Sequence, residues 1–84
     1  MIPVSAIVIS ELMRCRGSQL DRELYENVRK VVEAFGIELS RGEFNKILMT
    51  LELRGYVRVE AVKRESRIVY LVKTPQPHPI AGRR

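Results

Sequence analysis

The side chains best suited to chemistry are basic ones that gather late in the chain. Lys63 and Arg64 enter a polar turn, Arg64-Glu65-Ser66; Arg67 follows it, and Arg58 lies further back. Lysine and arginine neutralise phosphate groups. We therefore expect this turn to contact nucleic acid or another polyanion, with plain solvation of a charge-rich turn as the alternative.

A second polar set begins at Ser40. The run Ser40-Arg41-Gly42-Glu43 is a capping box, in which the serine hydroxyl and the glutamate carboxylate bond reciprocally to free backbone donors. Apolar residues follow at helical spacing as far as Gly55, so the run predicts a helix with Asn45 and Lys46 facing outward.

Catalytic and metal-binding chemistry is not expected. The serine, aspartate and glutamate residues form no nucleophile–base–orienter pattern, and no glycine-rich phosphate loop occurs. His78 stands alone in a proline-rich stretch, which argues against a metal site. We therefore expect no cofactor and no enzymatic activity.

The composition indicates one small, basic domain. Eighty-four residues carry 15 Lys+Arg against 10 Asp+Glu, a net charge of +5, with an apolar fraction of 45% and a sequence pI near 9.9. The charge is −2 over residues 21–39 but +4 over 40–73, so the positive field lies with the candidate binding elements. We expect a domain at 1–73 and a disordered, basic, proline-rich tail at 74–84, because proline cannot join a sheet ladder.

The start of the chain and its cysteine content favour a cytoplasmic protein. Met1 to Ser10 lacks the basic start of a secretory signal. A single cysteine, Cys15, cannot form a disulfide within the chain, and on an apolar stripe it is expected to be a small buried hydrophobe. No apolar run approaches the roughly 18 residues that span a bilayer.

Hydrophobic periodicity predicts the elements that must position the polar groups. The second helix is expected to place Leu24, Val28, Val31 and Phe35 on one face and to stop at Gly36. The first segment also permits a strand, because it is rich in β-branched residues. The expected elements are helices over Val4–Arg16, Leu20–Phe35 and the Ser40–Gly55 segment, then hairpin strands over Tyr56–Lys63 and Arg67–Lys73.

The first helix is more apolar than one buried face requires. One apolar stripe runs through Val4 and Val8, and a second runs through Ala6, Ile9 and Met13. Two explanations are open. Either the helix packs on two sides within the monomer, or Ile9 and Met13 belong to a dimer interface.

The expected order of elements is that of a winged helix-turn-helix: two helices, a short link, a third helix and a hairpin. The run Leu48-Met49-Thr50-Leu51-Glu52-Leu53-Arg54-Gly55-Tyr56-Val57 resembles the end of the third helix and the entry to the wing in archaeal and bacterial winged-helix regulators. In those families an L-x-x-L-E-x-x-G run anchors the helix, and its glycine turns the chain into the wing. The composition is also similar to that of small proteins of hyperthermophilic archaea.

The resemblance implies an α+β, mainly α, fold of three helices plus a C-terminal β-hairpin wing, and a protein that binds double-stranded DNA as a regulator of transcription or as a chromatin-associated accessory protein. The residues expected at DNA are Ser40, Arg41, Asn45, Lys46, Arg58, Lys63, Arg64 and Arg67. Those expected at a homodimer or partner interface are Ile9, Met13, Met49 and Leu53. The outward stripe of the third helix turns apolar at Met49 and Leu53, which predicts modest base reading. The alternative is a winged-helix adaptor that binds another protein in a transcription, replication or RNA-processing assembly.

Overall fold

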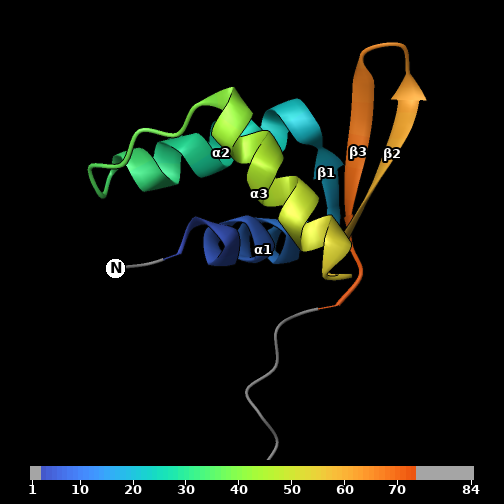
Figure 1. Cartoon of the computed structure of the whole chain (residues 1–84), viewed down its shortest axis with the longest axis horizontal. Helices are drawn as coiled ribbons and strands as arrows, with labels where there is room; N and C mark the ends of the chain where they lie inside the picture. The colour runs from blue at the N-terminus through green and yellow to red at the C-terminus, as the bar shows by residue number, and fades with distance from the viewer. Residues whose placement is uncertain (1–2, 74–84) are drawn as a thin grey trace, which may run out of the picture.

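The computed structural model describes residues 3–73, which form three helices and three strands in the order α1-β1-α2-α3-β2-β3 (Figure 1). The tail expected at 74–84 lies outside the described residues. About half of the described chain is helical, which confirms the α+β class. The elements are α1 (Val4–Arg14), β1 (Ser18–Leu20), α2 (Asp21–Glu33), α3 (Arg41–Leu53), β2 (Val57–Lys63) and β3 (Ser66–Leu71).

The first segment is a helix, and it packs within the chain on more than one side. Pro3 is its N-cap, and the helix ends at Arg14, two residues earlier than expected. The chain leaves it through left-handed backbone at Arg16 (φ 64°) and Gly17 (φ 95°). Ile9 is only 4% exposed and belongs to the core, so its assignment to an exposed interface is wrong. Apolar residues on two stripes are buried because α2, α3 and β3 all contact this helix.

The buried face of α2 is rotated relative to the expected one. Leu24, Val28 and Val32 are fully buried, whereas Val31 and Phe35 are 39% and 59% exposed. The helix ends at Glu33 rather than at Phe35, because the chain turns at Gly36 with φ 81°. Phe35 therefore leaves the helical face that it was expected to extend.

Helix α3 begins with the predicted capping box. The Glu43 amide donates to the Ser40 hydroxyl over 3.1 Å, and the Ser40 amide donates to the Glu43 carboxylate over 3.1 Å. The helix closes at Gly55, whose φ of 82° lets the Tyr56 amide reach the Leu51 carbonyl at 2.9 Å. Both ends of the helix therefore follow from the local sequence.

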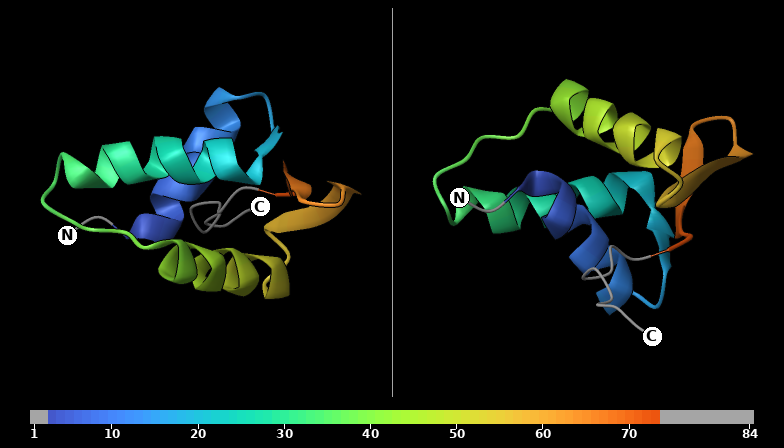
Figure 2. Two further views of the ribbon diagram at one scale, coloured as in Figure 1. Left: turned by 90° about the horizontal axis from the view of Figure 1, so that it is seen from above. Right: turned by 60° about the horizontal axis from the view of Figure 1, so that its bottom comes forward.

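The sheet has one strand more than the expected hairpin. Ser18–Leu20, whose last residue was expected to begin the second helix, forms β1 and pairs antiparallel with β3, so the strand order is β1-β3-β2. We call β2, β3 and their connection Arg64-Glu65 the hairpin. In Figures 1 and 2 the helices gather on one side of the sheet, and the hairpin extends past the end of β1.

One continuous core joins the helices to the sheet. Phe44 from α3 is completely buried and contacts the Tyr25 ring edge-on, with centroids 5.3 Å apart. The Tyr25 hydroxyl also donates to the Leu39 carbonyl at 2.9 Å, which ties the link before α3 to α2. The buried apolar residues are Ile7, Val8, Ile9, Leu12, Leu24, Val28, Val32, Leu39, Phe44, Leu48, Leu51, Val57 and Val69.

Candidate nucleic-acid interface

The tip of the hairpin carries exposed positive charge. Lys63 and Arg64 are exposed, and neither has an ion-pair partner among residues 3–73. A β-bulge falls between Ala61 and Lys63, just before the turn. Bulges re-aim side chains and increase the local twist of a hairpin. The tip therefore offers two unpaired cations at the end of a projecting element.

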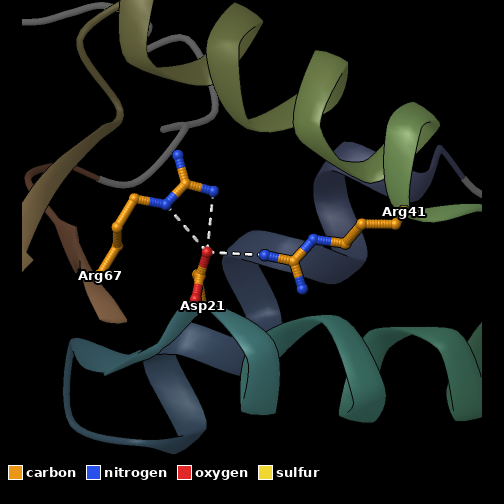
Figure 3. Close-up of polar contacts among 3 residues, drawn as sticks. All are labelled: Asp21, Arg41 and Arg67. Atoms are coloured by element: carbon orange, nitrogen blue, oxygen red, sulfur yellow. Dashed lines mark hydrogen bonds and ion pairs between the residues drawn. The ribbon is translucent and has the colours of Figure 1, made fainter. Parts of the chain in front are cut away.

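Behind the tip, one carboxylate joins three elements (Figure 3). Asp21, the first residue of α2, accepts from Arg41 of α3 at 2.7 Å, and from Nε and Nη2 of Arg67 of β3 at 3.0 and 2.8 Å. All three hydrogen bonds end on the same oxygen, Oδ2. The Asp21 side chain is 7% exposed, and the two arginine side chains are 40% and 45% exposed.

The sheet register brings Asp21 to Arg67. Along the antiparallel β1–β3 ladder, Gln19 pairs with Val69 and Leu20 pairs with Ile68. The next step of the same ladder sets Asp21 opposite Arg67. The contact between residues 46 positions apart thus depends on β1, the strand that the sequence did not predict.

Arg41 is held by packing as well as by charge. Its guanidinium carbon lies 5.3 Å from the centroid of the Tyr25 ring and 5.7 Å from that of Phe44. Cation–π contacts of this kind hold a guanidinium in one orientation over the ring faces. Arg41 was predicted to contact DNA, and here its head group is already oriented by an aspartate and two aromatic rings.

A basic pocket lies between the starts of α2 and α3 and the hairpin. Its volume is about 400 Å³, and its lining carries five bases and two acids. We call this cavity the basic pocket; its lining residues are Asp21, Arg22, Arg41, Ala61, Lys63, Arg64, Glu65 and Arg67. It unites four of the residues predicted to bind DNA, which come from distant parts of the chain.

A second hollow of about 500 Å³ separates α3 from the hairpin, and we call it the α3–hairpin groove. Asn45 lines it, as predicted for an outward polar residue, but so do Met49 and Glu52. Lys46 is exposed on the same helix and is absent from the lining of this groove. The groove is thus polar toward the start of α3 and mixed apolar and acidic further along.

Two residues predicted to contact DNA, Arg58 and Ser40, make other contacts within the protein. Arg58 pairs with Glu60 at 2.8 Å and lies over the Tyr70 ring at 5.2 Å. Strand alternation puts Arg58 on the sheet face opposite to Ala61 and therefore away from the basic pocket. The hydroxyl of Ser40 is similarly occupied, since it serves the capping box.

Of the four apolar residues predicted at an interface, three are exposed and one is buried. Met13 is 57% exposed on α1, and Met49 and Leu53 are 60% and 82% exposed on α3. Ile9, as noted, is buried. Cys15 is half-buried rather than buried, with its Sγ 3.7 Å from the Glu11 carboxylate.

Among the basic-pocket residues that were not predicted to bind DNA are two charged residues of α2, Asp21 and Arg22. Both fall in the acidic stretch 21–39, where they counted only as charges. The available signal was local: an aspartate in the first turn of α2 favours a helix start. Its pairing with two arginines required the β1–β3 register.

No family model, curated protein or solved structure matches this chain. Among residues 3–73, no helix has both the length and the apolar character needed to cross a membrane. The same part of the chain holds no group of three or more histidine, cysteine or acidic side chains placed to bind a metal ion.

Proposed function

We propose that this chain is a winged helix-turn-helix module that binds duplex DNA and regulates transcription. The observation that carries the proposal is the basic pocket, which sets five cationic side chains where the first turns of two helices meet the hairpin. Phosphate neutralisation supplies much of the affinity of small DNA-binding domains. In this function the hairpin is the wing, and α3 is the helix that faces the major groove.

Base reading falls to the first half of α3. Asn45 and Lys46 are exposed there and lie within two turns of the helix start, which is the part of a recognition helix that meets base edges. Further along, Met49, Glu52 and Leu53 offer apolar or acidic groups to the same side. We therefore propose strong backbone contact and modest sequence preference.

A fluorescence anisotropy titration tests the proposal. Labelled duplex DNA of mixed sequence is titrated with the protein at 50 and 200 mM salt. Binding that weakens by 10³-fold or more between these conditions requires roughly six or more phosphate contacts; a smaller set of contacts gives a shallower dependence. No binding at 50 mM salt would refute the proposed function.

The second candidate is a protein-binding adaptor on the same scaffold, and the exposed apolar residues of α3 favour it. Leu53 is 82% exposed and Met49 is 60% exposed, and because they are four residues apart they share one face of α3; adjoining exposed apolar side chains of this kind are typical of interaction sites. A second copy of the chain is one such partner, and a dimer would double the phosphate contacts. Sedimentation equilibrium of wild type and of the Met49→Gln, Leu53→Gln double variant tests whether a second copy is the partner. A wild-type dimer that the double variant abolishes supports pairing through α3. A wild-type monomer at high concentration refutes pairing through α3.

A further inference from the structure

Two guanidinium groups of like charge are held together at the wall of the basic pocket. Arg41 and Arg67 come from α3 and β3, and both donate to the single oxygen Oδ2 of Asp21. Without the carboxylate their charges would repel each other. Arg67 would lose its hydrogen-bond partner, and Arg41 would keep only its contacts with the Tyr25 and Phe44 rings. Asp21 fixes both head groups at one place.

The arrangement leaves hydrogen-bond donors for a ligand. Arg41 uses only Nη2 toward Asp21, and Arg67 uses Nε and Nη2. Each guanidinium carries five N–H donors, so Nε and Nη1 of Arg41 and Nη1 of Arg67 have no hydrogen-bond partner among the described residues. Both side chains line the basic pocket and are partly exposed to it. An anion can therefore bind them while Asp21 stays in place.

Displacement of Asp21 by the ligand is disfavoured. Its side chain is 7% exposed, and a buried carboxylate that loses both cationic partners is strongly destabilising. The incoming anion must therefore add to the arginines rather than replace the aspartate. Lys63 and Arg64 also line the pocket, have no ion-pair partner within residues 3–73 and are available to the neighbouring phosphates.

We propose that the basic pocket binds one backbone phosphate of DNA, and that Asp21 is a positioning residue that presets Arg41 and Arg67 for it. This inference rests on the proposed function. Arg41 of α3 and Arg67 of the hairpin would then bind the same phosphate, which fixes the orientation of α3 relative to the hairpin on the duplex. A negative residue thereby strengthens the binding of a polyanion.

The direction in which Asp21→Asn changes DNA affinity distinguishes a positioning role of Asp21 from an effect of its charge alone. If Asp21 acted only through its charge, Asp21→Asn would raise DNA affinity, because the protein becomes more positive. If Asp21 presets the arginines, the same change lowers affinity and removes one phosphate contact. Each phosphate contact contributes about 0.9 to the slope of log affinity against log salt concentration. When the lines for wild type and variant meet at 1 M salt, losing one contact weakens DNA binding about eightfold at 0.1 M salt.

Glu23→Gln is the matched control. Glu23 is exposed in the first turn of α2, two residues from Asp21, and belongs to none of the ion pairs of residues 3–73. Its neutralisation makes the same charge change and is expected to leave the slope unchanged, with equal or tighter binding. Asp21→Glu should restore part of the slope. Asp21→Asn that binds as tightly as Glu23→Gln, with an unchanged slope, overturns the inference and leaves the proposed function standing.

A measurement on the unaltered protein covers the case in which Asp21→Asn does not fold. Inorganic phosphate is titrated into wild-type protein while the arginine Nε–Hε signals are followed by NMR. We expect saturable shifts at Arg41 and Arg67, and none at Arg29, which pairs with Glu26 on the exposed side of α2. Uniform shifts at all arginines, or none, overturn the inference. Absence of DNA binding by wild type refutes the proposed function as well.

Discussion

Replacing Lys63 and Arg64 together by glutamine should weaken DNA binding without affecting the fold. Both side chains are exposed at the hairpin tip and have no ion-pair partner among residues 3–73. Surface changes of this kind alter the free energy of unfolding by less than about 0.5 kcal/mol. The thermal midpoint of the variant should therefore match that of wild type, and any loss of binding can be assigned to the interface.

The size of the effect follows from the number of contacts removed. If each side chain neutralises one phosphate, the slope of log affinity against log salt should become shallower by about 1.8. When the two lines meet at 1 M salt, this difference corresponds to about 60-fold weaker binding at 0.1 M. The assay is anisotropy with a labelled duplex at four or more salt concentrations.

A control variant separates contact from overall charge. Lys30→Gln with Arg54→Gln removes two exposed bases from the end of α2 and the end of α3, away from the basic pocket. It changes the net charge by the same amount and should leave the slope nearly unchanged. Equal slopes for wild type and the hairpin variant, or equal losses in the hairpin and control variants, would refute the assignment of these two residues to phosphate contact.

Three further predictions concern stability and ionisation. Ser40→Ala removes the capping box of α3 and should lower the free energy of unfolding by about 1 kcal/mol, measured by urea denaturation; an unchanged midpoint would contradict the role of the cap. Tyr25→Phe deletes the 2.9 Å, partly buried hydrogen bond to the Leu39 carbonyl and should lower the free energy of unfolding by about 1 to 2 kcal/mol in the same assay; an unchanged free energy would contradict the role of this bond. The pKa of Glu26 is lowered below its ordinary value, chiefly because Arg29 donates a hydrogen bond to its carboxylate; the folded-state pKa is depressed, so the small stabilisation is complete above the unfolded-state pKa and is lost as pH falls through the folded one. An NMR pH titration should show Arg29→Gln moving the Glu26 midpoint upward, and an unmoved midpoint would contradict this cause.

The elements set by local interactions could be predicted from the sequence. The start of α3 needs only Ser40 and Glu43, two residues three positions apart whose side chains each accept from the other's backbone amide. Gly36 and Gly55 end their helices through positive φ, which the neighbouring residues do not readily adopt. These features involve residues close together in the chain, so their signals survive in the sequence.

The elements that depend on distant partners could not be predicted. Ser18–Leu20 is too short and too polar to show alternation, and it becomes a strand only because β3 lies beside it. Asp21 then meets Arg67 through that register, and Arg41 joins them through the packing of α3. Likewise, Ile9 resembled an interface residue because its sequence neighbours do not show how many elements surround α1.

The short strand β1 also determines how the hairpin bears force. Pairing with β1 ends at Ile68, so only the part of the hairpin beyond Glu60 and Ile68 is unsupported by a third strand. From Glu60 to Lys63 this overhang is roughly 10 Å, at about 3.4 Å per residue. The hairpin is therefore a short projection that the contact between Asp21 and Arg67 holds at its base. If the tip binds DNA as proposed, a force on Arg64 reaches the first turn of α2 through the Asp21–Arg67 contact, so the helices as well as the tip would resist bending of the DNA.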